Sequence, residues 1–299
     1  MKAVQRSKAH HKKHLQRCFF VRQSFYLCKI LDFKAHLWYH DFTIKEALTM
    51  EYRKLTLDNL EKEHICCAIS NNKDIQVASK KAWLAERLKE GLVFLKSVER
   101  GKCFIEYIPA ENAWCPIEAE GYLHINCFWV SGSFKGHGYA NDLLSACIDD
   151  AKAQGRRGIT VISSPKKMPF LSDPKYLAYK GFRIADTAEP NFTLLYLPFD
   201  DNAPLPHFKD CAKHPKTDKQ GFVVYYTHGC PFTAKYVPIV ENLAKEKGIP
   251  FESILIDNKE KAQNAPMAWT NYGVFYQGKY ISNEILNEKR FLELVKRLT

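Results

Sequence analysis

The chain has 299 residues, a formal net charge of +11 and 10 cysteines. Its length predicts two domains, at about 150 residues for each. Residues 1–49 hold ten Lys or Arg against three Asp or Glu, so the remainder is only mildly basic and a nucleic-acid partner has little support. The sequence has no run of about 18 apolar residues, so it predicts no membrane-spanning helix. Without a secretory signal, so many cysteines favour a reduced, cytoplasmic setting.

The first 49 residues differ in composition from the rest of the chain. They contain no acidic residue before Asp32, and His10, His11 and His14 lie among lysines and arginines. Such a leader is compatible with an organellar transit peptide or with weak metal binding. Met50 opens the segment MEYRKLTLDNLEKEH, which reads as the natural start of a domain. We therefore interpret 1–49 as a basic extension that is either disordered or spurious.

From residue 51 onward, strand and helix patterns alternate. Asp58, with Glu61 three residues later, is placed to cap a first helix. Cys66 and Cys67 are interpreted as small apolar residues of that helical region. The other elements expected before residue 110 are a strand at Tyr52–Leu57, a helix at Ile75–Glu90 ended by Gly91, and strands at Leu92–Lys96 and Cys103–Ile108.

A strand, a glycine-rich loop and a helix form the centre of this first domain. Tyr122–Val130 alternates between apolar and polar residues, as a half-buried strand does. The helix that follows has one apolar face and ends near Gly155, a suitable C-cap. Between them, Gly132, Gly136 and Gly138 let backbone N–H groups approach a ligand. A loop of this kind before a helix N-terminus favours an anion such as a pyrophosphate.

The hexapeptide Lys135-Gly136-His137-Gly138-Tyr139-Ala140 resembles the Q/R-x-x-G-x-G/A signature of GNAT-family N-acetyltransferases. In that family the loop holds the pyrophosphate of acetyl-CoA, so the resemblance implies an acetyl-CoA-dependent enzyme with an α+β mixed sheet and flanking helices. Lys135 replaces the usual Gln or Arg, which keeps a cation but loses the guanidinium fork. The cofactor-binding residues implied by the resemblance are Phe128, Trp129, Val130, Lys135, Gly136, His137, Gly138, Tyr139 and Ala140.

The remaining elements of the first domain follow in the order of the GNAT family. The sequence predicts a buried strand at Gly158–Ser163, a helix at Met168–Lys180 ended by Gly181-Phe182, and a final strand at Phe192–Leu197. The resemblance therefore covers a first domain at residues 50–198.

Direct acetyl transfer needs a base for the acceptor ammonium, an acid for the leaving thiolate and an N–H donor for the developing oxyanion. The GNAT acid is commonly a Tyr four residues before the Gly of the Gly-Phe pair, and Leu177 holds that position here. Tyr176 is therefore our first choice for the acid, with Tyr179 on another helical face. The oxyanion donor is expected near Val130. The candidate bases, which spacing does not separate, are His124, Glu106 and Glu120.

Residues 199–220 are rich in proline and charge and are expected to form a linker. The linker holds a C-x-x-H pair, Cys211 and His214, but two ligands do not make a zinc site. We therefore predict a free thiol there, and no metal in the protein.

The C-terminal segment, residues 221–299, has a β-α-β, then β-β-α order that resembles the thioredoxin fold. The expected elements are strands at Phe222–Thr227, Phe251–Asp257, Ala268–Tyr276 and Lys279–Ile281, a helix from residue 231 to Lys247, and a last helix at Glu288–Leu298 with Phe291, Leu292, Val295 and Leu298 on its apolar face. This order predicts a second domain.

The resemblance to thioredoxin implies a nucleophile at Cys230, at the N-terminus of the domain's first helix. Thr233 replaces the resolving cysteine of the usual C-x-x-C, so this motif offers a single thiol. We expect the helix dipole to favour the Cys230 thiolate and Thr233 to donate a hydrogen bond to it. Pro238 stands at the place of the family's kink proline, and Ala265-Pro266 at that of the family's cis-proline, which faces the cysteine.

Together, the two halves resemble the YoaP family of bacterial acetyltransferases, over nearly everything after Met50. The resemblance implies transfer of an acetyl group from acetyl-CoA to a small-molecule amine or a peptide N-terminus, with Tyr176 and Cys230 as candidate catalytic residues. The identity of the acceptor and the oligomeric state stay open. The alternative function is that of a CoA-binding thiol-redox or metalloid-handling protein that acts through Cys230.

Overall fold

The computed structural model describes residues 50–67, 71 and 73–299. Our expectations for the basic extension, residues 1–49, therefore lie outside the described residues. From Glu51 to Thr299 the chain forms one unit by its internal contacts. Among the described helices, none has both the length and the apolar character that crossing a membrane requires.

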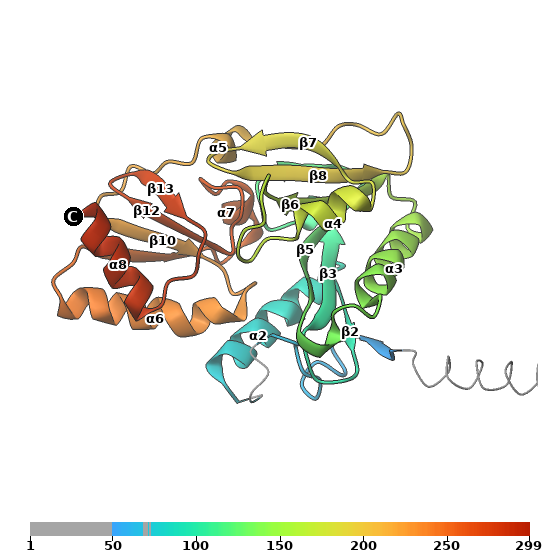
Figure 1. The fold of residues 1–299 in the computed structure, drawn as a ribbon, viewed down its shortest axis with the longest axis horizontal. Coiled ribbons are helices and arrows are strands. Elements are labelled where there is room, and N and C mark those ends of the chain that lie inside the picture. Colours follow the sequence, from blue (N-terminus) through green and yellow to red (C-terminus); the bar gives the residue numbers. More distant parts are fainter. Residues whose placement is uncertain (1–49, 68–70, 72) are drawn as a thin grey trace, which may run out of the picture. The chain divides into compact units, whose positions relative to one another are not determined.

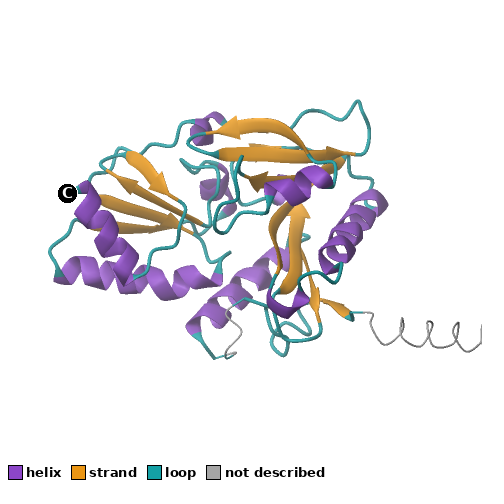
Figure 2. Ribbon diagram, viewed as in Figure 1, coloured by secondary structure: helices purple, strands orange, loops and turns teal. Residues whose placement is uncertain are grey.

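The larger sheet has seven strands in the order β1-β2-β3-β5-β6-β8-β7 (Figures 1 and 2). Neighbouring strands are antiparallel except β5 and β6, which are parallel. The strands are β1 (Tyr52–Lys54), β2 (Val93–Ser97), β3 (Cys103–Pro109), β5 (Tyr122–Val130), β6 (Gly158–Ser163), β7 (Arg183–Ala188) and β8 (Phe192–Pro198). The predicted α/β fold class is confirmed, although β7 was not expected.

Two long helices flank this sheet. Helix α3 (Tyr139–Ala153) contacts β3, β5 and β6. Its apolar face turns toward the sheet, where Leu143, Leu144, Cys147 and Ala151 are buried. Helix α2 (Ile75–Lys89) begins after Asp74, whose side chain accepts a hydrogen bond from the Gln76 N–H, and it lies beside α6 (Pro231–Glu246) of the C-terminal segment (Figure 1).

The first helix that we expected after Asp58 is a turn instead. The Asn59 side chain accepts a hydrogen bond from the Thr56 N–H at 2.9 Å and donates one to the Lys54 carbonyl at 3.0 Å. Such local bonds to the backbone compete with helix formation. Cys66 and Cys67 are buried, as expected of small apolar residues, but they lie outside any helix.

The helix expected at Met168–Lys180 is confined to α4 (Pro174–Tyr179). The Asp173 side chain accepts hydrogen bonds from the Lys175 and Tyr176 N–H groups and so fixes the start of the helix. Pro174 has no N–H and disfavours a helix running in from upstream. Residues 167–172 form a loop as a result.

The C-terminal segment forms a four-stranded sheet in the order β11-β10-β12-β13. Strands β10 and β11 are parallel, and the other neighbours are antiparallel. Its elements are β10 (Phe222–Tyr226), α6, β11 (Phe251–Leu255), α7 (Lys259–Gln263), β12 (Tyr272–Tyr276), β13 (Lys279–Ser282) and α8 (Glu288–Leu298). Apart from the short α7, this is the element order on which the resemblance to thioredoxin rests. On α8, Phe291 and Leu294 are buried, whereas Leu292 is exposed.

Residues 199–220 are tied to the fold more closely than a linker requires. They contain β9 (His207–Phe208), which pairs with β4 (Ile117–Glu118), and the short helix α5 (Asp210–Lys213). Phe208 is completely buried, and its N–H donates to the Asp186 carboxylate at 2.9 Å. The linker therefore packs against the seven-stranded sheet, which its polar composition did not predict.

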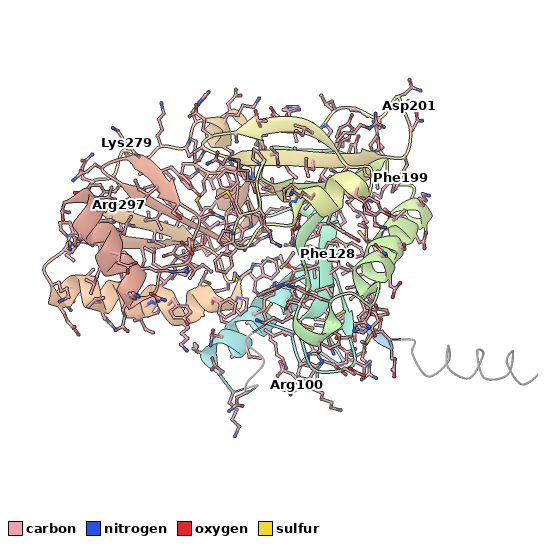
Figure 3. The ribbon with its side chains drawn as sticks, viewed as in Figure 1. Arg100, Phe128, Phe199, Asp201, Lys279 and Arg297 are labelled. Atoms are coloured by element: carbon pink, nitrogen blue, oxygen red, sulfur yellow. The ribbon has the colours of Figure 1, made fainter. Side chains whose placement is uncertain are left out.

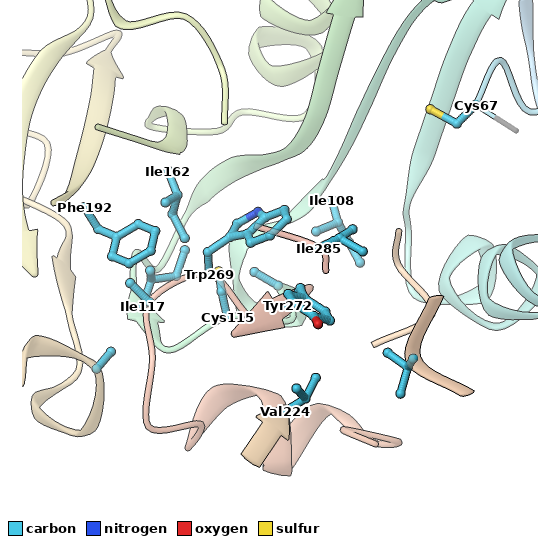
Figure 4. Close-up of a cluster of buried hydrophobic side chains, with 14 of the residues drawn as sticks. Cys67, Ile108, Cys115, Ile117, Ile162, Phe192, Val224, Trp269, Tyr272 and Ile285 are labelled. Atoms are coloured by element: carbon cyan, nitrogen blue, oxygen red, sulfur yellow. The ribbon is translucent and has the colours of Figure 1, made fainter. Parts of the chain in front are cut away.

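One hydrophobic cluster joins the two sheets. It includes Ile162 and Phe192 from the seven-stranded sheet together with Trp269, Tyr272 and Val224 from the C-terminal segment (Figure 4). Burial of this apolar surface holds the two sheets against each other. The chain from residue 51 therefore shares a core across the predicted domain boundary.

Candidate active site

The candidate site begins where two parallel strands part. Strands β5 and β6 pair over residues 122–125 and 158–161, and β5 then continues to Val130 along β3. A register shift next to Glu106 leaves Asn126 as an extra residue in β5, which is a β-bulge. The end of β5 thus has an edge that β6 does not cover. Phe128, Trp129 and Val130, which the resemblance assigns to cofactor binding, lie on that open edge.

The glycine loop lies directly after this edge. Gly132, Gly136 and Gly138 have φ angles of +66°, +85° and +85°, a backbone region that favours glycine. A Cβ atom at any of them would meet nothing within 4 Å, so the space beside the backbone is open. Gly138 is the N-cap of α3 and has no side chain to cap it; the Asn141 N–H donates to the Gly138 carbonyl at 2.7 Å, which leaves the Tyr139 and Ala140 N–H groups to an incoming anion. A pyrophosphate fits this cradle.

Aromatic contacts hold the loop in place. The Phe134 ring lies so close to Gly101 that a side chain at Gly101 would collide with it. The His137 ring stacks on Tyr139 with 5.4 Å between centroids, while Lys135 is exposed at the loop surface. His137 and Tyr139 therefore support each other beside the cradle, and Lys135 is free to turn toward a phosphate.

A cavity of about 400 Å³, called the central pocket below, opens beside the bulge. Its walls come from β3, β5 and α2, from the loop 167–172, and from residues 229–232 and 269–271 of the C-terminal segment. Figure 3 labels Phe128, which lines the pocket from β5. The aromatic lining residues are Trp83, Phe94, Phe104, Trp114, Phe128, Trp129, Phe170, Phe232 and Trp269.

A buried ion pair lies in the wall of the central pocket. The Lys80 ammonium is 2.6 Å from a Glu106 carboxylate oxygen, and both side chains are at most 4% exposed. The other carboxylate oxygen accepts a hydrogen bond from the Asn126 side chain at 3.3 Å. Burying charges in this way requires a partner for each of them. Of the three candidate bases, Glu106 is the carboxylate that the structure places in the pocket.

The other two candidate bases are unsuited to the role. His124 is buried, bonds the Thr160 hydroxyl at 3.0 Å, and has its pKa lowered to about 3 by burial. It lines the central pocket, but its other ring nitrogen lies 3.5 Å from the Cys115 sulfur, so both ring nitrogens have partners within the protein. Glu120 is exposed and lies outside the pocket lining.

The two candidate acids, Tyr176 and Tyr179, lie on helix α4 in different surroundings. The Tyr176 ring packs edge-on against Phe128 with 5.8 Å between centroids, and its hydroxyl donates to the Asn141 side chain at 3.2 Å. Burial raises the pKa of Tyr176 to about 12, so the hydroxyl keeps its proton at neutral pH. Tyr179 is 83% exposed, and Leu177 is fully buried in the core. Tyr176 thus lies at the open end of β5, where the acid is needed.

Cys230 lines the central pocket from the N-terminus of α6. Burial raises the pKa of this thiol to about 11, although the backbone N–H of Phe232 and the charge on Lys80 act in the opposite direction. The expectation of a favoured thiolate is therefore wrong, because desolvation outweighs the helix terminus. Cys67 and Cys127 line the same pocket, and burial raises the pKa of both thiols.

Two further expectations for this motif are corrected. The Thr233 hydroxyl is bonded to the backbone carbonyls of Thr227 at 2.7 Å and Cys230 at 2.8 Å, and does not donate to the Cys230 sulfur. The peptide bond before Pro266 is trans; the cis bond among the described residues precedes Pro190. Pro238 does lie inside helix α6, as expected.

Sequence reasoning missed the partners of Glu106. Lys80 lies on α2 and Asn126 on the bulge, and neither belongs to a motif. The signal for Lys80 was its place among the apolar positions of an amphipathic helix, since a lysine there must find a buried partner. Trp83 follows it on the same face, and the Lys80 ammonium lies 4.2 Å from its ring centre.

Comparison with known protein families agrees with this geometry. A family model described as "Acetyltransferase (GNAT) family" matches residues 57–166, and one described as "YoaP-like" matches residues 250–293. The first match spans the bulge, the glycine loop and β6, and the second spans β12, β13 and the start of α8.

The chain is also similar to individual proteins and solved structures. The chain is 42% identical over 250 residues to "Uncharacterized N-acetyltransferase YoaP" of Bacillus subtilis (strain 168), which covers 83% of this chain and 100% of that protein. Among solved structures, Escherichia coli GNAT family N-acetyltransferase YhbS in complex with CoA is 11% identical, covers 55% of this chain and 91% of its own, and has a TM-score of 0.38. YncA, a putative acetyltransferase of Salmonella typhimurium with its cofactor acetyl-CoA, is 17% identical, with coverages of 52% and 97% and a TM-score of 0.36.

Proposed function

Since this chain belongs to the YoaP-like family of GNAT N-acetyltransferases, we propose that it transfers the acetyl group of acetyl-CoA to an amine held in the central pocket. The observation that carries the proposal is the position of the open edge of β5. This edge has the glycine loop at its end and the buried Glu106 carboxylate at its bulge, so one strand joins a cradle for a pyrophosphate to a candidate base.

The residues present suit acetyl-CoA, which supplies an activated acetyl thioester. The N–H groups of the segment Lys135–Ala140 and the first turn of α3 would hold the pyrophosphate. The exposed Lys135 ammonium would add a positive charge. The backbone of Phe128–Val130, free of β6, would bind and orient the pantetheine arm.

Three groups of the chain would then carry out the two proton transfers and stabilise the developing negative charge. Glu106 would take a proton from the acceptor ammonium, so that the neutral amine can attack. A backbone N–H near Val130 would stabilise the negative charge that develops on the acetyl oxygen. Tyr176, whose hydroxyl is protonated at neutral pH, would give a proton to the leaving sulfur.

The pocket wall favours an amine with an apolar body. Of the described lining residues, those with a formal charge are Lys80 and Glu106, which pair with each other, and Lys167, which pairs with Asp173 at 3.0 Å. The other lining side chains are mainly aromatic or aliphatic. A carboxylate or phosphate on the acceptor would therefore enter an apolar site without a spare cation, at the cost of its hydration.

A matched pair of amines tests this proposal. Tryptamine and tryptophan differ by one carboxylate, and CoA release can be followed with each at saturating acetyl-CoA. We expect acetylation of tryptamine with a kcat/KM at least about tenfold above that of tryptophan, since an unpaired buried charge costs more than about 1.4 kcal/mol. Binding of acetyl-CoA with no turnover of tryptamine or of other apolar amines would contradict the proposal. A preference for tryptophan would overturn the assignment of the acceptor class alone.

A further inference from the structure

Lys80 has contacts in both halves of the chain. Its ammonium donates to the Glu106 carboxylate at 2.6 Å and to the Gly229 backbone carbonyl at 2.7 Å. The lysine belongs to α2, the carboxylate to β3, and the carbonyl to the loop that leads into α6. One buried ammonium therefore links the candidate base to the residue before Cys230.

The loop that offers this carbonyl is fixed by its neighbours. The Thr227 hydroxyl donates to the Asn271 side-chain oxygen at 2.7 Å and accepts from the Gly229 N–H at 3.1 Å. A Cβ atom at Gly229 would collide with that same Asn271 oxygen. The C-terminal segment thus sets the position of the Gly229 carbonyl. It leaves no room for a side chain at residue 229.

The other titratable groups that face Glu106 are thiols. Cys127 lies opposite it on β5, and Cys230 approaches it from the C-terminal segment. Burial raises the pKa of both thiols, so both are neutral near pH 7. The cation in direct contact with Glu106 is therefore the Lys80 ammonium.

We propose that Lys80 is a positioning residue through which the C-terminal segment, by the Gly229 carbonyl, holds a positive charge against Glu106 and orients its carboxylate for the acceptor amine. This inference rests on the proposed function, because Glu106 is the base of the proposed reaction. It also assigns the C-terminal segment a part in acetyl transfer that needs no redox chemistry at Cys230. In this view, removal of the ammonium or displacement of the carbonyl alters one and the same titration.

The chain offers a matched control for Lys80. Lys81 follows it on α2, is 4% exposed as a residue against 3% for Lys80, and donates to the Glu61 carbonyl at 2.6 Å, away from the central pocket. Lys80→Met and Lys81→Met therefore both remove a buried ammonium from the same helix, and Lys80→Met alone removes one beside Glu106. Lys80→Arg keeps the charge, and Gly229→Ala disturbs the link from the C-terminal side.

The first measurement follows the Glu106 side chain itself. The full chain is labelled with ¹³C at the glutamate carboxyl carbons, and the Glu106 resonance is identified by its loss in Glu106→Gln. We expect this resonance to titrate about one pH unit or more higher in Lys80→Met, and to move in the same direction in Gly229→Ala, because a carboxylate without its cation is protonated more easily. Lys81→Met should match the wild type. A wild-type titration in Gly229→Ala would overturn the link to the C-terminal segment.

The second measurement is the pH dependence of kcat/KM with tryptamine as the acceptor. The acidic limb of Lys80→Met should lie about one pH unit above that of the wild type, so that its loss is about tenfold at pH values below the limb and smaller at pH 7, and Lys80→Arg should keep the wild-type limb. A uniform loss at every pH would indicate a merely structural role and contradict the inference. The wild type itself tests the proposed function: no turnover of tryptamine or of other apolar amines would overturn that function, while the carboxyl titration would still decide whether Lys80 and Gly229 control Glu106.

Discussion

At the scale of single residues, Gly138 is the most constrained glycine of the loop. It has a φ of +85°, caps α3, and leaves open space where a side chain would begin. In Gly138→Asp, a carboxylate would lie where the pyrophosphate is expected. We therefore expect acetyl-CoA affinity, measured by titration calorimetry, to fall by at least about tenfold through charge repulsion at the helix N-terminus.

Gly155 provides the control for backbone strain. It has a φ of +65°, a Cβ atom there would likewise meet nothing within 4 Å, and it lies past the other end of the same helix. Gly155→Asp and Gly138→Asp should each cost about 1–2 kcal/mol of folding free energy, because both force a side chain into the left-handed region. If both variants bind acetyl-CoA as the wild type does, the loop is not the pyrophosphate site.

At the scale of elements, the short helix α4 presents two tyrosines in different surroundings. Tyr176 contacts Phe128 and Asn141 at the open edge of β5, while Tyr179 is 83% exposed. We expect Tyr176→Phe to lower kcat about 100-fold, the contribution of a general acid, with little change in KM. Tyr179→Phe should keep the wild-type kcat. Equal rates for the two variants in a CoA-release assay would mean that Tyr176 only packs against Phe128.

The same elements show what the sequence can predict. Strands β5 and β6 and the start of α3 follow from alternation, apolar runs and glycines, because these signals are local. Helix α4 is shorter than expected, since the Asp173 cap and Pro174 outweigh the apolar residues before them. The Lys80–Glu106 pair joins residues 26 positions apart, and the contact to Gly229 spans 149. No periodicity in one chain encodes such partners.

The acidity of Cys230 could not be predicted for the same reason. Its position at a helix N-terminus is local information and favours a thiolate. Its burial depends on the walls that β5 and α2 contribute to the central pocket, and this desolvation raises the pKa of the thiol instead. The glycine loop that we propose for the cofactor follows from one local motif, whereas the walls of the central pocket depend on the packing of both halves.

At the scale of the whole molecule, the chain from residue 51 to residue 299 forms one unit through its internal contacts. The Val98 N–H donates to the Glu51 carbonyl at 2.9 Å, and β1 pairs with β2 at the edge of the sheet. The Bacillus relative also matches along its full length while leaving about one sixth of this chain uncovered. The start of a domain at Met50 stays a prediction, which a truncated chain can test.

A chain that begins at Met50 should therefore keep the melting temperature and the acetyl-CoA affinity of the full chain. Removal of residues 1–54 is the control, because it deletes β1 and exposes the edge of β2. We expect that control to melt lower by several degrees, since each kcal/mol lost shifts the melting temperature by about 2–4 °C in a protein of this size. Differential scanning calorimetry on the three chains, with and without acetyl-CoA, measures both effects. A comparable fall on removal of 1–49 alone would show that these residues stabilise the fold, and the start of the folded unit would have to be moved upstream.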